Sequence, residues 1–301
     1  MEEKFKSGFV SLVGRTNVGK STLLNRLIGE KVAIATSKPQ TTRTAIKAIV
    51  NGDNYQIIIT DTPGIHKPKT KLSKTMIDTA FKMFSEVDAI IFLIEATSEN
   101  IGMGDSRILE KIKESNRPCI LVINKIDLIK KEKLLKIIEL YSKEYNFSAI
   151  VPISAEKDIG IDELIKEILN LLPEGPKYYA EDEYTDQTSR QLAEEIIREK
   201  ALKFLNDEVP HGIYVEVEKF SFRKTSKKED IYDIEAYIYC LRESHKGIII
   251  GKGGNKLKQI ASYAREDIEK MLGTKVNLKV WVKVKEDWQE NDNIVNKFKL
   301  K

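Results

Sequence analysis

The chain has 301 residues, of which 41% are hydrophobic and 32% are charged, with a formal net charge of +4 at neutral pH. This length exceeds the usual size of one compact domain, so we expect two domains. No run approaches the roughly 18 apolar residues of a membrane span. The amino terminus lacks a signal-like apolar segment, and the two cysteines and three histidines are widely separated. We therefore expect a cytoplasmic protein with reduced thiols and no His–Cys metal site.

Short β-branched segments alternate with helical patterns through the first half of the chain. Segments such as 90–94 and 120–123 are apolar throughout, as in strands that are covered on both faces. The alternation predicts an α/β domain with a mostly parallel sheet flanked by helices. The expected strands cover residues 9–13, 45–50, 56–61, 89–94, 119–124 and 149–153.

A cluster of helix breakers, residues 173–176 (PEGP), follows a helical pattern over residues 162–172. A helix cannot continue through this cluster, so the first domain is predicted to cover residues 1–172. Residues 173–187, which are acidic from 178 to 186, are the predicted linker, and residues 188–301 form the second domain.

Residues 14–21 (GRTNVGKS) follow the first expected strand and precede a helical pattern, which is the context of a phosphate-binding loop. In such a loop backbone N–H groups surround the β-phosphate, the lysine reaches the β- and γ-phosphates, and the serine hydroxyl binds Mg2+. The predicted nucleotide-binding residues here are Gly14, Arg15, Thr16, Asn17, Val18, Gly19, Lys20, Ser21 and Thr22.

The loop alone does not distinguish ATP from GTP, but Asn124, Lys125 and Asp127 follow another expected strand. The Asp127 carboxylate can accept hydrogen bonds from guanine N1–H and its exocyclic amine, whereas adenine would leave that charge unpaired. Asn124 is expected to tie the base site to the phosphate loop, and the Lys125 stem to cover the ring. Ser154 and Ala155 are predicted to add a backbone N–H for guanine O6.

Two further segments have the order of switch regions. Asp61, Thr62, Pro63 and Gly64 follow a strand, and we expect Asp61 to hold Mg2+ through water and the Gly64 N–H to contact the γ-phosphate. Upstream, Thr42 is the predicted second hydroxyl ligand of Mg2+, with Thr41 as the alternative. Contacts that exist only with the γ-phosphate would let these segments order in one nucleotide state.

The second half predicts a small α+β layer. Its pattern gives a helix over residues 188–206, strands over 213–220 and 231–241, a helix over 255–272 and a last strand over 276–284. Before the second helix, the short apolar segment 248–250 leads into Gly251-Lys252-Gly253-Gly254. This turn is similar to the GXXG loop of KH domains, where glycines allow close approach of a nucleic-acid backbone.

Basic residues gather around this turn, although the second half as a whole has equal numbers of acidic and basic side chains. The lysines are expected to meet phosphates, and two isoleucines to offer an apolar platform to unpaired bases. The predicted RNA-binding residues are Lys246, Ile249, Ile250, Gly251, Lys252, Gly253, Gly254, Lys256 and Lys258.

Five nucleotide-binding motifs followed by a KH-like segment resemble one family, the bacterial Era GTPases, over nearly the whole chain. The supporting stretches are residues 40–43, 61–66, 193–200, 208–211, 246–251 and 281–284. Gln191 and Gln289 depart from the family pattern, in which the first position usually carries an aromatic residue and the second commonly carries arginine. We expect these departures to concern local packing or one phosphate contact and to leave the resemblance intact.

The resemblance implies a GTPase with a carboxyl-terminal type II KH domain that binds the 3′ region of 16S ribosomal RNA and acts in 30S subunit assembly. It implies Mg2+ as cofactor, a monomer, and peripheral contact with the inner membrane from the cytoplasmic side. Ile65 stands where other GTPases carry a catalytic glutamine, and Asn17 is expected to help hold K+ at the phosphates. Slow intrinsic hydrolysis is therefore expected, with Lys20, Thr42 and Gly64 as catalytic residues and no general base.

Two alternatives remain open from the sequence. In one, the protein is a signalling GTPase whose second domain binds protein, and the GXXG segment is only a turn. In the other, the protein is a nucleotide-binding scaffold without turnover, which Ile65 would allow because an aliphatic side chain cannot orient water.

Overall fold

The computed structural model describes residues 4–29, 33, 46–62, 64, 70–98, 100–206, 209–226 and 228–296. Contacts divide the chain into two compact units, with the break between Asp186 and Gln187. Each unit has its own sheet, and the two are described separately. Within these residues, no helix is both long and apolar enough to cross a membrane.

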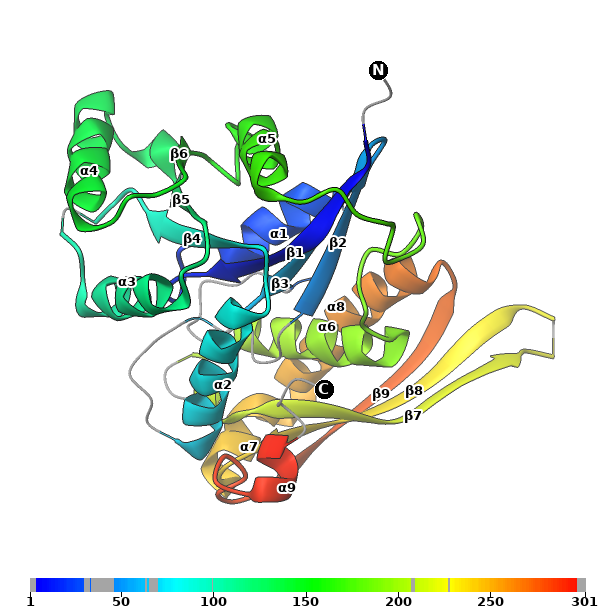
Figure 1. The fold of residues 1–301 in the computed structure, drawn as a ribbon. Coiled ribbons are helices and arrows are strands. Elements are labelled where there is room, and N and C mark those ends of the chain that lie inside the picture. The colour runs from blue at the N-terminus through cyan, green and yellow to red at the C-terminus, as the bar shows by residue number, and fades with distance from the viewer. Residues whose placement is uncertain are drawn as a thin grey trace. The chain divides into compact units, whose positions relative to one another are not determined.

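The first unit is a six-stranded sheet with helices on both faces (Figure 1). The strand order is β2-β3-β1-β4-β5-β6, and all neighbours are parallel except β2 and β3. The strands are β1 (Lys6–Val13), β2 (Ile46–Gly52), β3 (Tyr55–Asp61), β4 (Ala89–Glu95), β5 (Cys119–Asn124) and β6 (Ala149–Pro152). The α/β prediction is confirmed.

Two apolar clusters hold the helices against this sheet. One cluster joins α1 and α5 to one face, and the other joins α3 and α4 to the opposite face. Strands β4 and β5 are buried on both faces, which explains their uninterrupted apolar sequences. The helices are α1 (Lys20–Ile28), α2 (Lys71–Lys82), α3 (Met103–Ser115), α4 (Lys131–Glu144) and α5 (Ile161–Leu171), with short 3-10 turns η1 (Met83–Ser85) and η2 (Ile126–Leu128).

The segment after α5 runs along the antiparallel edge of the sheet. The Ile49 N–H of β2 donates to the Tyr184 carbonyl at 3.0 Å. The buried Gln56 amide accepts from the Tyr178 and Tyr179 N–H groups at 2.7 and 3.0 Å and donates to the Tyr179 carbonyl at 2.9 Å. Much of the acidic segment between the two units is therefore attached to the first unit.

The second unit has the element order α–β–β–α–α–β. Its sheet has the order β7-β8-β9, with β7 and β8 antiparallel and β8 and β9 parallel. The elements are α6 (Ser189–Phe204), η3 (Val209–Gly212), β7 (Tyr214–Lys224), β8 (Asp230–Cys240), α7 (Glu243–Ile250), η4 (Lys252–Gly254), α8 (Asn255–Leu272), β9 (Lys275–Val284) and α9 (Asp292–Val295).

Local chemistry explains where α6 begins. Thr188 and Gln191 form a reciprocal capping box, in which each side chain accepts from the other residue's backbone N–H, at 3.3 and 2.9 Å. Residues 243–250 form helix α7, whereas the sequence pattern predicts only a short apolar segment there. The KH prediction for this half is confirmed.

Candidate nucleotide and RNA sites

The phosphate loop lies at the carboxyl end of β1 and leads into α1. Two glycines are required by close approaches: a Cβ on Gly14 would lie 2.3 Å from the Leu93 carbonyl oxygen, and one on Gly19 would lie 2.2 Å from the Asn124 amide. Gly19 also has φ 105°, which favours glycine. Asn17 is exposed in the loop, Thr16 is half-buried and Val18 is buried, and Ser21 and Thr22 lie in the first turn of α1.

Lys20 is almost fully buried inside this loop. Its ammonium donates to the Gly14 and Arg15 carbonyls at 3.2 and 3.0 Å. Burial lowers the pKa of Lys20, while the nearby Asp61 carboxylate acts in the opposite direction. The loop thus holds a cation at its centre, in the position where a bound phosphate would need one.

The Asp61 segment lies against the phosphate loop. Asp61 is buried at the end of β3, and Thr62 donates from its hydroxyl to the Leu12 carbonyl at 2.9 Å. A Cβ on Gly64 would lie 2.8 Å from the Thr16 methyl, so Gly64 touches the loop directly. Pro63, Thr41, Thr42, Ile65 and the rest of the predicted switch stretches 40–43 and 65–66 lie outside the described residues.

On the other side of the loop, Asn124 links three motifs. Its Nδ2 donates to the Val18 carbonyl at 2.8 Å, and its Oδ1 accepts from the Ala155 N–H at 3.0 Å. Lys125 donates from Nζ to the Asn17 carbonyl at 2.8 Å. The structure therefore brings together the phosphate loop, residues 124–127 and residues 154–155.

The groups predicted to recognise guanine differ in whether they already form hydrogen bonds within the protein. Asp127 is exposed in η2 and makes no hydrogen bond or ion pair with any residue that the structure describes. The Ser154 N–H donates to the Ile159 carbonyl at 3.0 Å, and the Ala155 N–H donates to Asn124. A guanine O6 would therefore share the Ala155 donor with Asn124, and the Ser154 N–H is already used.

Two acidic residues that are not among those predicted from the sequence contact basic side chains of this site. Asp105 of α3 is fully buried, and its carboxylate accepts from Arg15 Nε at 3.1 Å. Glu95, at the end of β4, lies 2.8 Å from Lys125 Nζ and 3.9 Å from the Arg15 guanidinium. A sequence signal existed for the first of these, because Asp105 shares a helical spacing with the buried Ile108, Leu109 and Ile112.

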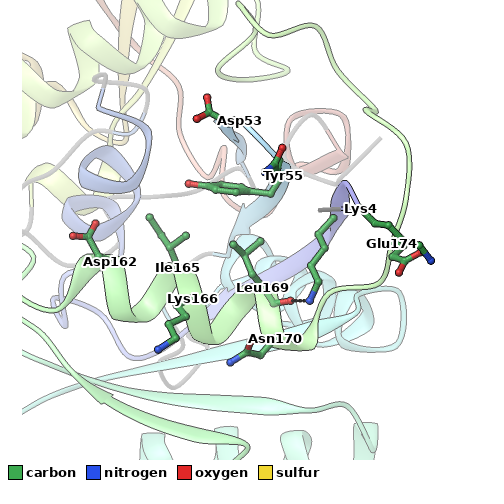
Figure 2. Close-up of a pocket in the computed structure, with 11 residues that line it drawn as sticks. Lys4, Asp53, Tyr55, Asp162, Ile165, Lys166, Leu169, Asn170 and Glu174 are labelled. Carbon is green, nitrogen blue, oxygen red and sulfur yellow. Dashed lines mark hydrogen bonds and ion pairs between the residues drawn. The ribbon is translucent and has the colours of Figure 1, made fainter. Parts of the chain in front are cut away.

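A hollow of about 720 Å³ lies elsewhere in the first unit, beside α5 (Figure 2). Ile165 and Leu169 point from α5 toward Tyr55, and Lys6 donates to the Leu169 carbonyl at 2.5 Å. None of the residues predicted to bind nucleotide or RNA lines this hollow.

In the second unit, the GXXG segment forms a tight turn between α7 and α8. Gly251, Gly253 and Gly254 have φ values of 72°, 59° and 78°, so the turn depends on glycine. No atom lies within 4 Å of a Cβ built on Gly253 or Gly254, which leaves space over the backbone. The bare backbone is therefore open to close approach at this turn.

The predicted RNA-contacting side chains are only partly available. Lys252 and Lys258 are exposed, Lys256 is half-buried, and Lys246 is half-buried with an ion pair of 3.7 Å to Glu243. The prediction that Ile249 offers a surface to bases is wrong, because its exposed fraction is 0%. Residues 248–250 belong to α7, where successive side chains point about 100° apart. Ile248 is 44% exposed and Ile250 is half-buried.

A phosphate loop with its guanine-type and switch motifs, followed by a KH fold, defines a class of P-loop GTPase that carries a KH domain. Family models agree with both halves: one described as a 50S ribosome-binding GTPase matches residues 9–125, and one described as a KH domain matches residues 208–289. GTPase Era of Thermoanaerobacter sp. (strain X514) is 52% identical over 97% of this chain and 96% of its own length. GTPase Era of Clostridioides difficile (strain 630) is 53% identical over 98% of both chains.

Solved structures give the same result. The crystal structure of Era in complex with MgGDPNP and nucleotides 1506–1542 of 16S ribosomal RNA is 42% identical, with a TM-score of 0.93 over 98% of both chains. Aquifex aeolicus Era bound to GDP.AlF4- is also 42% identical, with a TM-score of 0.92, covering 98% of this chain and 99% of that one. The chain therefore belongs to the Era family and is a GTPase.

Proposed function

We propose that this GTPase is a molecular switch that binds the 3′ region of 16S ribosomal RNA in one nucleotide state and acts in 30S subunit assembly. The nucleotide-binding part of this proposal is supported by one observation: the phosphate loop, the Asp61 segment and the Asn124 segment meet at the carboxyl edge of one sheet. The RNA assignment draws on the exposed glycine turn at residues 251–254 and on the RNA-bound relative. The protein is taken to work as a monomer in the cytoplasm, with peripheral contact at the membrane.

Each motif has a distinct task in this proposal. Lys20 and the loop N–H groups neutralise the phosphates, and Asp127 selects guanine by accepting from N1–H and the amine. The remaining loop residues, Gly14 to Ser21 with Thr22, enclose the phosphates, Asn124 and Lys125 hold the base site to them, and Ala155 supplies the O6 donor.

The oxygen donors fit a hard divalent cation. Ser21 carries a hydroxyl in the first turn of α1, and Asp61 is a buried carboxylate close to the Lys20 ammonium. Ser21, Asp61 and Thr42 are the residues that would hold Mg2+, and a bound Mg2+ would supply positive charge beside the phosphates. Thr42 and the Gly64 N–H would respond to the γ-phosphate, so these segments would relax after hydrolysis.

Potassium is the finer part of the cofactor proposal. Ile65 cannot orient water, so the transition-state charge requires another stabiliser, and Asn17 stands at the exposed rim of the loop. We expect GTP hydrolysis to be several-fold faster in KCl than in NaCl of equal ionic strength. The Asn17→Ala variant should lose this difference. Equal rates of the unmodified protein in the two salts would exclude a potassium role.

The central test is filter binding of a single-stranded RNA that ends in the 16S 3′ sequence, with GDP or with a non-hydrolysable GTP analogue at fixed salt. We expect tighter binding with the GTP analogue. The double change Lys252→Asp and Lys256→Asp should weaken binding at least tenfold, because two phosphate contacts become repulsive. The matched control exchanges two exposed lysines of the first unit, Lys113→Asp and Lys143→Asp, and should bind as the unmodified protein does.

Other results would change the proposal. Equal RNA binding in both nucleotide states would describe an RNA-binding GTPase without coupling. Absence of RNA binding would favour the alternative, a signalling GTPase whose second unit binds protein.

A further inference from the structure

The sheet of the second unit has one face covered by helices and one face that they leave open. Helices α6, α7 and α8 pack on the face that carries Ile234, Ala236 and Ile238 (Figure 1). Side chains alternate along a strand, so the odd-numbered residues of β8 and β9 lie on the opposite face. The open face is defined as the odd-numbered residues of β8 from 231 to 239 and of β9 from 275 to 283, together with the β7 residues that pair with those of β8.

Five aromatic rings form a continuous row across one end of this face. Trp288 contacts Tyr214 with ring centroids 4.6 Å apart, and Tyr214 stacks on Tyr239 at 4.6 Å and 10°. The row continues from Tyr239 to Tyr237 at 6.1 Å and from Tyr237 to Trp281 at 5.3 Å and 25°. Trp288 is fully buried, whereas Trp281 is 40% exposed, so the row runs from the core to an accessible indole.

Lysines line the same face along the edge strand β9. Lys283 Nζ lies 3.4 Å from the centre of the Tyr237 ring, and Lys285 Nζ lies 5.5 Å from the centre of Tyr239. Lys275 and Lys279 are exposed at alternate positions of the same strand, on either side of Asn277 and next to Trp281. Along β9 the lysines therefore recur every four residues, at 275, 279 and 283, about 13 Å apart, and Lys285 follows just after the strand.

Acidic groups lie on the β7 side of this face, so charge is unevenly distributed across it. Glu216 and Glu218 belong to β7, and Glu235 belongs to β8. Glu218 lies 3.8 Å from Lys283, and Glu235 lies 3.9 Å from Lys219, whereas Lys279 and Lys285 have no ion pair with any described residue. Lys219 and Arg223 of β7 are paired with Glu235 and Asp233, so the positive charge without an acidic partner among the described residues lies along β9, where a polyanion would bind.

We propose that the open face is a second RNA-binding surface, in which an unpaired base stacks on the exposed Trp281 while phosphates follow the lysines along β9. Exposed aromatic rings beside a basic track are the features that bind single strands without sequence preference. A protein partner with an apolar surface fits less well, because lysines lie over the rings that it would have to cover. This surface rests on the proposed RNA-binding function and is separate from the GXXG turn, which joins α7 and α8 on the covered side of the sheet.

Tryptophan fluorescence tests the proposal directly, because stacking of a base on an exposed indole quenches its emission. The protein has two tryptophans, and the buried Trp288 provides a constant background. We would titrate a 20-nucleotide oligouridine into the full chain carrying Lys252→Asp and Lys256→Asp, so that the GXXG turn contributes little. We expect saturable quenching that is absent after Trp281→Phe, since phenylalanine keeps the stacking but not the emission.

Affinity measurements on the same background separate stacking from charge. Trp281→Ala should weaken binding about tenfold through the lost base stack. The pair Lys279→Glu and Lys285→Glu should reduce the slope of log affinity against log salt by about one to two. Phe222→Ala, an exposed aromatic residue on the opposite face of the same sheet, and Lys224→Glu should have no effect. Unchanged GTP hydrolysis and thermal unfolding would show that the variants are folded.

The outcomes distinguish this surface from the proposed function. If the Trp281 and lysine variants bind RNA as the parent does, while Lys252→Asp with Lys256→Asp removes binding in the otherwise unmodified chain, the second surface is excluded and the KH assignment stands. If the unmodified chain binds no RNA, the proposed function itself fails. Quenching that depends on Trp281 and weakens with the lysine changes would establish the surface.

Discussion

Asp105 is a carboxylate with an exposed fraction of 0%, and it binds Arg15 of the phosphate loop. Burial raises the pKa of Asp105, whereas the Arg15 guanidinium and hydrogen bonds from Tyr141 and the Gly102 backbone lower it. A buried carboxylate without a partner would be costly, so Arg15 and Asp105 constrain each other. We infer that Asp105 positions the phosphate loop from α3 without touching the nucleotide.

The change Asp105→Asn should test this at the scale of one residue. It removes a charge-assisted hydrogen bond of about 1.5–3 kcal/mol to Arg15, so we expect release of GDP to become roughly tenfold faster. Stopped-flow measurement with a fluorescent GDP analogue gives the release rate. Tyr141→Phe is the matched control, because it leaves the Arg15–Asp105 pair in place and should change release less than threefold. An unchanged release rate in Asp105→Asn would contradict the positioning role.

Ile249 shows where residue-level reasoning from sequence fails. The three consecutive isoleucines 248–250 look equivalent as letters, yet one is buried, one half-buried and one exposed. The difference arises because they lie in a helix, whose side chains leave the axis in different directions. By contrast, the close approaches at Gly14 and Gly19 follow from a motif whose chemistry demands bare backbone.

At the scale of elements, Glu194 joins α6 to β7. Its carboxylate accepts from the Val217 N–H at 2.8 Å, next to a register shift between Val217 and Lys219. Burial raises the pKa of Glu194 to about 7, and the neighbouring Glu195 and Glu216 add to this effect. The folded state therefore binds a proton here that the unfolded state has already released above pH 5.

The resulting pH dependence has a definite sign. From about pH 4.5 upward the folded state holds more protons at this site, so Glu194 makes stability fall as pH rises through its pKa of about 7, and the effect levels off near pH 8. Glu194→Gln keeps the acceptor for Val217 but carries no charge, so it should raise stability at pH 8 by about 1–2 kcal/mol and by much less at pH 5. Urea unfolding at both pH values measures this. A stabilisation of equal size at pH 5 and pH 8 would show that titration of Glu194 is not its cause.

The segment from Tyr178 to Asp186 is an element whose contacts the sequence pattern does not predict. Its acidic, irregular sequence indicates a solvated linker, but Gln56 and the free edge of β2 supply hydrogen bonds for it. Edge strands have unpaired N–H and C=O groups that any extended chain nearby can satisfy. Sequence patterns do not contain that information, because the edge exists only once the strand order is set.

At the scale of the whole molecule, the chain is two compact units, and the predicted nucleotide and RNA residues lie in different ones. The expected preference of RNA for the GTP-analogue state belongs to this scale, since no single residue is assigned to both sites. Reciprocity then requires RNA to tighten GTP-analogue binding by the same factor, which the filter-binding experiment can measure in either direction.

The sequence by itself determined the class of fold, the strand positions of the first unit and the motifs at their carboxyl ends. It could do so because alternation, apolar runs and phosphate-loop chemistry are local properties of the chain. Only the tertiary structure decided that Asp105 and Glu95 support the nucleotide site, that Ile249 is buried, and that Trp281 ends an aromatic row beside lysines of β9. Those features depend on strand order and on which face a helix covers, and both bring together residues that lie far apart in the sequence.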